Sequence, residues 1–264
     1  ELWADESGYY TFKDKRRNPR TFSGKPVESA FSHKGKYLWI TYYRRSYDIN
    51  AQEPSAVAVL DTERDTIIRM FETGPLPKMI AVSDDGTRLA VTHWGDNTVG
   101  VMYISSDRPE DWHYISNYVI GSKLSLDYSR TEPVNRDNGS GHCLRGTLFT
   151  PDNRYLLVGC MGGAGGIAVI DLEASSYLGR IVGLKPNVRH LICKNGYLYA
   201  SINTAGYVQR AEMTSVYSAI AELDGKRETA RINGWESCKV FPGARTIVAS
   251  PDGRFIFAAC NFSS

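Results

Sequence analysis

The sequence has no long hydrophobic run. Its 264 residues are 42% hydrophobic and 23% charged, and no apolar stretch approaches the roughly 20 residues that a membrane-spanning helix needs. No signal peptide is recognisable either. The sequence begins at Glu1 without a Met, so an upstream segment could have been removed or left out.

Common enzyme signatures are also absent. Neither the Gly-x-Ser-x-Gly elbow of hydrolases nor the His-Glu-x-x-His motif of zinc proteases occurs. The glycine run 162–166 is not followed by the Lys-Ser/Thr of a phosphate-binding loop, and residues 167–171 form a strand-like pattern. We therefore interpret the glycine run as a connection between two strands, which uses the conformational freedom of glycine.

Cysteine and histidine are few and scattered. The five cysteines form no CxxC pair, and their odd number argues against a fully disulfide-linked domain. Cys160 and Cys260 fall at equivalent strand positions, where we expect buried thiols. The neighbours His142 and Cys143 lack the spacing of metal ligands. We expect no metal and no cofactor, although His93 and His190 could meet across a channel.

An excess of one charge is missing as well. With 31 Lys and Arg against 29 Asp and Glu, the formal net charge is only +2. Nucleic-acid-binding domains usually have a clear basic excess. Binding of nucleic acid is therefore the weakest of the function classes considered.

What the sequence does contain is a repeat. Five times an apolar run leads into a polar turn containing Gly or Asn, and a second apolar run follows. The intervals between the residues that open these turns are 51, 67, 43 and 57, and these residues are Ser32, Ser83, Thr150, Cys193 and Ser250. Strand-like repeats of this length predict a β-propeller.

The runs after the turns are apolar at successive positions, as in strands that are buried on both faces. These runs are 37–40, 89–91, 155–158 and 255–258. Further strands are predicted at 56–61, 66–73, 99–104, 113–121, 166–171 and 177–183, and a short helix is a possible interpretation of 216–223. Four strands per repeat is the number in a propeller blade.

Several segments resemble the YVTN-type β-propeller repeat. They are SDDGTRLAVTHWGDNTVGVMYI, SPDGRFIFAACN and GGIAVIDLEASSYLGRIVG, and the resemblance covers about residues 25 to 264. It implies an exported protein in a surface-layer, periplasmic or lipoprotein setting, and a binding scaffold. The short turn at Cys193 and two large insertions depart from the pattern.

We predict an all-β fold, a β-propeller of four-stranded antiparallel blades. Ser264 falls after the second strand of the fifth repeat, so we expect an incomplete sequence and a ring of six to eight blades, with seven preferred. The alternative is a five-bladed ring closed by N-terminal strands at 9–12 and 20–22. The predicted parts of this single domain are outer strands at 1–24, blades at 25–74, 75–121, 143–183 and 184–243, an inserted loop at 122–142 and half a blade at 244–264.

The insertions are the first functional indication. Relative to the shortest interval, the first, second and fourth repeats have 8, 24 and 14 additional residues. The first insertion maps to Arg44–Pro54 and the second mainly to Ser122–His142. In an up-and-down blade both connections emerge on the same face, and long loops on one face of a rigid scaffold commonly bind ligands.

Basic residues recur at the start of the innermost strands. Lys78, Arg145 and Arg245 lie five residues before their turns, and Arg189 lies four before. These four residues would line the central channel as a cationic collar able to bind carboxylate or phosphate. The alternative is that each pairs with a neighbouring carboxylate or carbonyl group and only fills the channel.

Aromatic residues are predicted near the same rim. Tyr47, Trp94 and Trp235 are the ones expected to be exposed, where flat rings suit sugars, peptides or unstacked bases. His190 follows Arg189 and completes the predicted ligand-binding site. Tyr42 and His93 are expected to pack at the edges of blades.

Two function classes compete. The favoured one is a noncatalytic binding or scaffold propeller of the cell envelope, which recognises a protein, a glycan or an anionic ligand through its loop-rich face and basic channel. The alternative is a lactonase-like or quinoprotein-like enzyme, a kind to which some related propellers belong, with a metal or cofactor in the channel.

Overall fold

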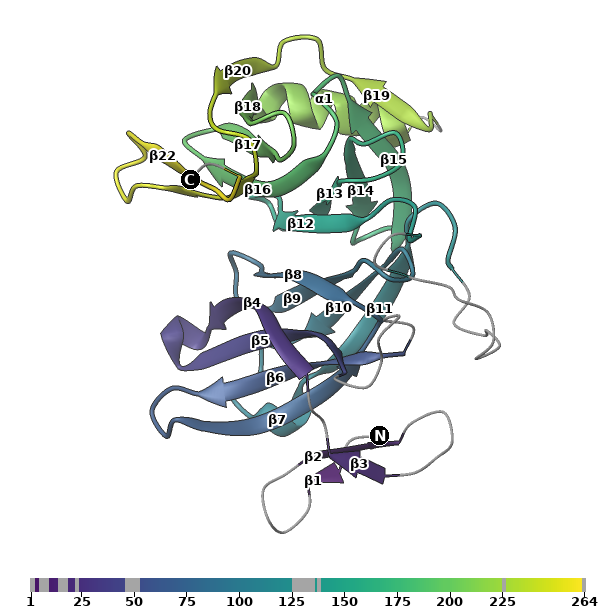
Figure 1. The fold of residues 1–264 in the computed structure, drawn as a ribbon, viewed down its shortest axis with the longest axis vertical. Coiled ribbons are helices and arrows are strands. Elements are labelled where there is room, and N and C mark those ends of the chain that lie inside the picture. Colours follow the sequence, from purple (N-terminus) through teal and green to yellow (C-terminus); the bar gives the residue numbers. More distant parts are fainter. Residues whose placement is uncertain are drawn as a thin grey trace. The chain divides into compact units, whose positions relative to one another are not determined.

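The computed structural model describes residues 3–4, 10–13, 19–21, 24–45, 53–124, 136, 139–224 and 227–262, with the backbone alone for 3–21 and Arg45. The fold is all-β, as predicted, and forms two compact units (Figure 1). The first unit consists of Glu1–Val82, Gly86–Asn117 and Gly121–Ser140. The second consists of Ser83–Asp85, Tyr118–Ile120 and Gly141–Ser264.

The first unit contains two four-stranded antiparallel sheets, in each of which the strands follow in chain order. This is the up-and-down order of a propeller blade (Figure 1). One sheet consists of β4 (Gly24–Ser32), β5 (Tyr37–Arg45), β6 (Ser55–Asp61) and β7 (Thr66–Thr73), with the short helix η1 (His33–Gly35) in its first turn. The other consists of β8 (Pro77–Val82), β9 (Arg88–His93), β10 (Thr98–Tyr103) and β11 (His113–Val119), with η2 (Pro109–Asp111) before β11.

A three-stranded antiparallel sheet precedes these blades. Its strands are β1 (Trp3–Ala4), β2 (Tyr10–Lys13) and β3 (Pro19–Thr21). Strands were predicted here at 9–12 and 20–22.

The second unit repeats the same arrangement. Its first sheet contains β12 (Leu144–Phe149), β13 (Tyr155–Cys160), β14 (Ile167–Asp171) and β15 (Ser176–Val182). Its second contains β16 (Val188–Lys194), β17 (Tyr197–Ile202), β18 (Tyr207–Glu212) and β20 (Glu236–Lys239), and a two-stranded sheet contains β21 (Ala244–Ala249) and β22 (Ile256–Cys260). The number of blades in a closed ring stays a prediction.

The additional residues of the fourth repeat form a helix and a strand. The helix α1 (Met213–Asp224) extends the predicted 216–223 segment at both ends, and its Val216 and Ile220 belong to the core of the second unit. Strand β19 (Thr229–Arg231) pairs in parallel with β15 and adds a fifth strand to that sheet. No helix in the described ranges has the length and hydrophobicity of a membrane-spanning segment.

The repeated turns are stabilised by the hydroxyl group that opens them. Thr150 Oγ1 donates to Asp152 Oδ1 at 2.5 Å, and Ser250 Oγ donates to Asp252 Oδ1 at 2.5 Å. Each hydroxyl also accepts from a backbone N–H five residues later, at 3.0 Å in both cases. Such local side-chain bonds favour a turn over continued strand, which explains the regular spacing of this motif.

Each unit has its own apolar core. In the first, Trp39 and Trp112 are fully buried with their ring centroids 5.0 Å apart, and Trp39 stacks on Phe71. In the second, side chains of α1 pack with Leu191 and Leu198 of the fourth repeat. Burial of the inner strands on both faces is confirmed for β9 and β13.

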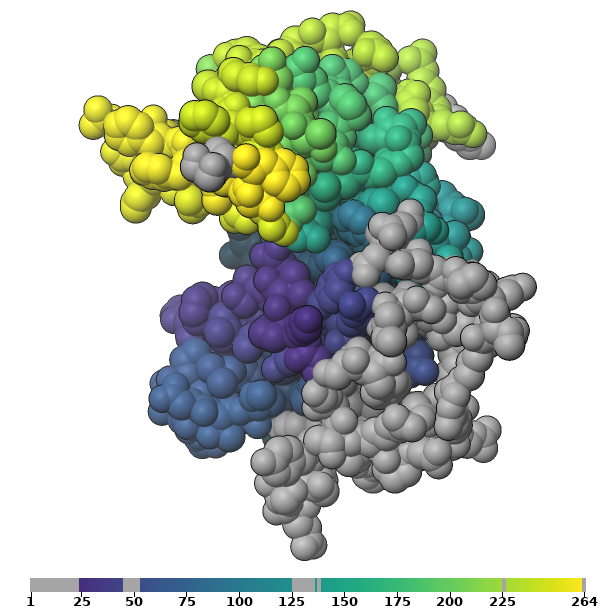
Figure 2. Space-filling model, viewed as in Figure 1, coloured from purple at the N-terminus to yellow at the C-terminus, as the bar shows by residue number. Residues whose placement is uncertain are grey.

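The prediction of burial on both faces is wrong for the last repeat. Phe255 and Phe257 are 55% and 58% exposed, and Val248 on the partner strand is exposed too. The reason is that β21 and β22 form a sheet of only two strands. Figure 2 shows this hairpin, in yellow, projecting from the rest of the second unit.

Candidate functional site

In the part of the chain that the structure describes, the first strand of each of the five repeats contains a β-bulge near its start. In β12, Leu144 pairs with Cys160 and Thr147 with Val158, so one additional residue is inserted between these pairs. Corresponding register shifts occur in β4, β8, β16 and β21. Bulges redirect side chains and increase the local twist of a strand.

The predicted basic residues occupy these bulges. Lys78, Arg145 and Arg245 are each followed by a second residue inside the shifted segment, whereas Arg189 stands there alone. Arg189 therefore lies four residues before its turn, and not five, because the shifted segment of its strand is one residue shorter.

A hydroxyl group on the second strand holds several of these bulges. Thr41, Thr92 and Ser201 accept hydrogen bonds from the N–H groups of Glu28, Met79 and His190, at 3.2, 3.1 and 3.0 Å. The equivalent positions in the third and fifth repeats are Gly159 and Ala259.

Two of these hydroxyls also bind the next sheet. Thr41 Oγ1 donates to the carbonyl oxygen of Lys78 at 3.0 Å, and Ser201 Oγ donates to that of Arg245 at 2.7 Å. The backbone of the basic residue is therefore fixed by the preceding blade. The sequence signal was available, since these hydroxyls lie eight or nine residues after the turn.

In the second unit three arginines lie on neighbouring strands, each the first strand of its repeat. β12 lies beside β16, and β16 lies beside β21. Arg145 and Arg189 are buried, whereas Arg245 is exposed. Arg189 Nη1 lies 3.7 Å from the sulfur of Met161. The side-chain amide of Asn261 fits its hydrogen-bond partners when its oxygen and nitrogen exchange places. Its nitrogen then donates to the carbonyl oxygen of Gly243, and its oxygen accepts from Arg245 Nη1 at 3.1 Å.

Close approach of β12 and β16 requires glycine beside Arg145. A Cβ atom on Gly146 would lie 2.8 Å from the carbonyl oxygen of Arg189 and 2.9 Å from Cα of His190. Contacts shorter than about 3 Å are not tolerated between such atoms. The glycine therefore allows the two bulges to lie against each other.

His190 lies among these arginines as a neutral imidazole. Burial, assisted by the positive charges of Arg189 and Arg145, lowers its pKa to about 4. The N–H of Ile247 donates to His190 Nδ1 at 3.2 Å. Because Nδ1 accepts this bond, the proton of the neutral ring lies on Nε2.

Lys78 occupies the equivalent bulge in the first unit and lies beside two aromatic rings. Its Nζ lies 3.8 Å from the ring centroid of Tyr43 and 5.1 Å from that of Trp94. The structure therefore brings two predicted site residues, Lys78 and Trp94, together as a cation–π cluster.

The two tryptophans that were expected to be exposed are exposed only in part. Trp94 and Trp235 are only partly exposed, and both indole N–H groups are buried. The physical reason for Trp235 is that its ring packs against the apolar core of the second unit. Burial of His93 and partial burial of Tyr42 are confirmed. Tyr47 lies outside the described residues, as do residues 46–52 of the first insertion and most of the second.

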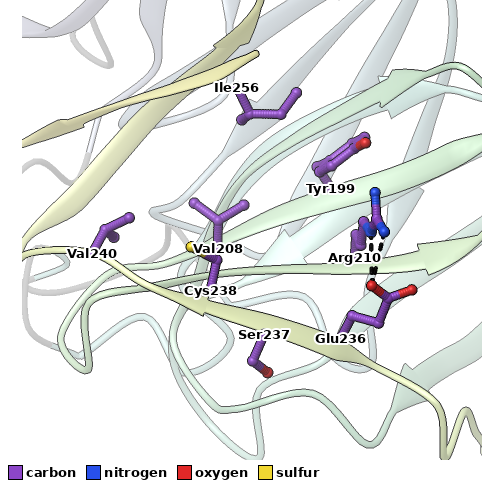
Figure 3. A pocket seen from close by; sticks show the side chains of 8 residues that line it. All are labelled: Tyr199, Val208, Arg210, Glu236, Ser237, Cys238, Val240 and Ile256. Carbon is purple, nitrogen blue, oxygen red and sulfur yellow. Dashed lines mark hydrogen bonds and ion pairs between the residues drawn. The ribbon is translucent and has the colours of Figure 1, made fainter. Parts of the chain in front are cut away.

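A pocket of about 340 Å³ lies in the second unit, where Ile256 of β22 faces the outer strands of the preceding sheet (Figure 3). Arg210 donates to Glu236 Oε2 at 2.8 and 3.1 Å, and this ion pair, with Tyr199, raises the pKa of Arg210. Cys238 contributes an exposed free thiol to the same wall. The two charged side chains of this pocket, Arg210 and Glu236, are therefore paired with each other.

A second pocket, of about 480 Å³, lies in the first unit. It is lined by Pro54, Glu72, Thr73, Gly74, His93, Asp96, Tyr114, Ile115, Ser116, Asn117 and Lys123. Its floor contains a chain of hydrogen bonds that the sequence did not indicate, because its members come from the ends of three different strands.

The chain runs through both nitrogens of His93. Thr73 Oγ1 lies 2.5 Å from Nε2, and Thr98 Oγ1 lies 2.8 Å from Nδ1. Thr98 Oγ1 in turn donates to Asp96 Oδ1 at 2.7 Å. Burial, assisted by the charge of Lys123, lowers the pKa of His93 to about 3, so the imidazole is neutral at physiological pH.

Among the described residues, no three His, Cys, Asp or Glu side chains converge as metal ligands. Cys160 is fully buried, and burial raises its pKa to about 12, in agreement with its predicted place in the core.

Comparisons with known proteins bear on the fold. No model of a protein family matches the sequence, and no curated protein matches it. The solved structure of Kuenenia stuttgartiensis hydrazine synthase is similar over 99% of this chain and 89% of that chain, at 18% identity and a TM-score of 0.49. A functionally unknown protein from Desulfotomaculum acetoxidans DSM 771 is similar over 77% of this chain and 58% of its own, at 12% identity and a TM-score of 0.52. The second likeness shows the fold alone.

Proposed function

We propose that this protein is a noncatalytic binding propeller that recognises an anionic group through Arg145, Arg189, Arg245 and His190. The supporting observation is that three guanidinium groups start from the bulges of neighbouring strands beside a neutral histidine. Guanidinium groups bind carboxylate, sulfate and phosphate through charge-assisted and bidentate hydrogen bonds.

The proposed site offers hydrogen-bond donors. Each arginine has five N–H donors and no acceptor, and the Nε2–H of His190 adds another. The only acceptor atom of the His190 ring is already used by the N–H of Ile247. Such a set of donors suits an anion.

The sharpest test compares two exposed arginines of one hairpin. Arg245 belongs to the proposed site, whereas Arg254 lies in the turn between β21 and β22 and packs on Phe255. A sulfated oligosaccharide and an oligoglutamate peptide serve as probes, titrated calorimetrically at about 50 and about 300 mM salt. We expect salt-sensitive binding that Arg245→Glu weakens about tenfold or more and Arg254→Glu leaves within about twofold.

Two results would overturn this proposal. One is that neither probe binds the unaltered protein. The other is that both variants weaken binding equally, because the effect would then come from net charge and not from the site.

The biological setting is part of the same proposal. On the resemblance to the YVTN-type repeat, we place the protein outside the cytoplasm, as a periplasmic or surface scaffold of the lipoprotein type with a protein or glycan partner. We propose that Lys78, with Trp94, serves the same class of ligand in the first unit. Detection of the native protein in cytoplasmic fractions alone would contradict the envelope location.

A further inference from the structure

The pocket beside His93 is lined in part by the described ends of the two insertions. Pro54 ends the first insertion, and Lys123 lies at the start of the second, and both line this pocket. The start of the second insertion is fixed to the turn after β9, because Asn97 Nδ2 donates to the Ser122 carbonyl and Leu124 N donates to that of Asp96. The volume of about 480 Å³ lies within the range of small-molecule sites.

The hydrogen-bond chain fixes which groups of the floor donate and which accept. Thr98 gives its proton to the Asp96 carboxylate, so its oxygen accepts from Nδ1–H of His93. Nε2 then has a free lone pair and accepts from the hydroxyl of Thr73. The oxygen of Thr73 is left as an acceptor at the floor of the pocket.

Asp96 has a second oxygen that the described residues do not satisfy. Thr98 binds only Oδ1, through its hydroxyl at 2.7 Å and its N–H at 3.2 Å. Within the described ranges nothing donates to Oδ2, although the residue is buried. Asp96 lines the pocket, so Oδ2 is the oxygen that a ligand hydroxyl can bind there, and hydrogen bonds to a carboxylate are strong ones.

Tyr114 is a second buried polar group in the wall. Its Oη makes no hydrogen bond of normal geometry with a described residue, although the nearby Thr73 partly offsets the rise in pKa that burial causes. Gly100 makes room for this ring, because a Cβ there would lie 2.7 Å from Cε1 of Tyr114. Tyr114 and the exposed Ile115 add apolar surface to the polar floor.

The charges around the pocket have both signs. Glu72 and Asp96 are acidic, and Lys123 is basic. Burial raises the pKa of Asp96, and the opposing influences are its bond to Thr98 and the charges of Lys123 and Arg136. An anion would meet two carboxylates, and a cation would meet Lys123. A neutral ligand with many hydroxyl groups can instead donate to the carboxylates and accept from Lys123 and Asn117.

We propose that this pocket binds a neutral monosaccharide unit, with Asp96 and Thr73 accepting from its hydroxyl groups and Tyr114 packing against its C–H surface. Sugar hydroxyls both donate and accept, which matches the mixture of groups on the floor and rim. An aromatic ring beside polar groups is a common wall for such ligands. This site is separate from the arginines of the second unit.

The test compares neutral sugars with analogues in which one group is replaced by a charged one. Glucose, galactose and mannose are compared with glucosamine and galactosamine, which are cationic, and with glucuronate and galacturonate, which are anionic. Binding to the whole chain is measured by saturation-transfer NMR and titration. We expect at least one neutral hexose to bind and its charged counterparts to bind about tenfold more weakly or not at all.

Variants then assign the binding to the pocket. Asp96→Asn keeps an acceptor for Thr98 and places an amide where Oδ2 was, so we expect at least about tenfold weaker binding of the neutral hexose. Glu72→Gln on the exposed rim tests the same site if Asp96→Asn does not fold. The exposed Asp107→Asn in the same unit is the matched control and should bind as the unaltered protein does.

The proposal is overturned if no neutral hexose binds, if a charged analogue binds as tightly, or if Asp107→Asn weakens binding as much as the pocket variants. Arg245→Glu should leave sugar binding unchanged. Loss of anion binding with intact sugar binding, or the reverse, therefore separates failure of this inference from failure of the proposed function.

Discussion

Ser201 donates a hydrogen bond of 2.7 Å from its Oγ to the carbonyl oxygen of Arg245, which lies 44 residues further along the chain. The same oxygen accepts from the N–H of His190 at 3.0 Å. One fully buried hydroxyl thus joins the bulge of β16 to the bulge of β21. Thr41 makes the corresponding pair of bonds in the first unit.

Replacing Ser201 with Ala is expected to destabilise the protein. The change removes two part-buried hydrogen bonds, and each such bond contributes about 0.5–1.5 kcal/mol. Urea denaturation measures the free energy of unfolding. Ser218→Ala is the control, because Ser218 Oγ donates to Thr214 O on the exposed side of α1. Equal stability of the two variants would contradict a role for the bulge hydroxyl.

Stability should fall on acidification because of His190. Its pKa is about 4 in the folded chain and 6.5 as the ordinary value. Between these pH values the unfolded chain binds the proton and the folded chain does not, so stability is lost as the pH falls from 6.5 to about 4. The loss amounts to at most about 3 kcal/mol.

The measurement is the free energy of unfolding as a function of pH for the unaltered protein and for His190→Asn. An Asn oxygen can still accept from the N–H of Ile247, but it does not titrate. The two curves should therefore diverge across this window, with the unaltered protein losing more stability as the pH falls. Parallel curves would show that His190 does not keep a lowered pKa.

Lys78→Met tests the cation–π cluster of the first unit. The Lys78 ammonium lies over Tyr43 and near Trp94, and an interaction of this kind contributes about 0.5–2 kcal/mol. We expect a loss of that size in denaturation, with a change in tryptophan fluorescence. The control is Lys36→Met, since Lys36 is exposed and lies 5.3 Å from the centroid of Tyr37. If both variants lose the same stability, the buried cation contributes nothing specific.

Gly74→Ala is expected to disturb the floor of the sugar pocket. A Cβ on Gly74 would lie 2.5 Å from Cγ and Nδ1 of His93, and forcing atoms into such space costs about 1–3 kcal/mol. Gly234→Ala is the control, because nothing lies within 4 Å of a Cβ there. Thermal unfolding of both variants gives the comparison, and an unchanged Gly74→Ala would mean that the His93 ring is free to move.

Much of the fold could be predicted because turn and strand signals are local. Strand β7 was predicted at its exact residues 66–73, since polar residues bound an apolar run. The helix within the fourth repeat was visible as a break in the strand pattern. Burial of 255–258 could not be judged in this way, because it depends on how many strands share the sheet.

The sites depend on contacts that local patterns do not encode. The bulges were missed because the repeats were aligned on their turns, and an inserted residue at the far end of a strand leaves the turn unchanged. The pairing of Thr73 with His93 joins residues 20 apart that end different strands. The basic positions were found because they recur at nearly constant spacing, but their convergence in one collar, like the blade count and the division of 1–264, stays a prediction.

The bulges also change which side chains of a strand point to which face of its sheet. Side chains of a strand alternate between two faces, and one additional residue reverses that alternation on one side of the insertion. The apolar residues after the bulge keep their places in the blade whatever residue occupies the bulge itself. Repeats of this kind can therefore carry Val27, Lys78 or Arg145 in the bulge without altering the order of their cores, so one scaffold can present different side chains at this position.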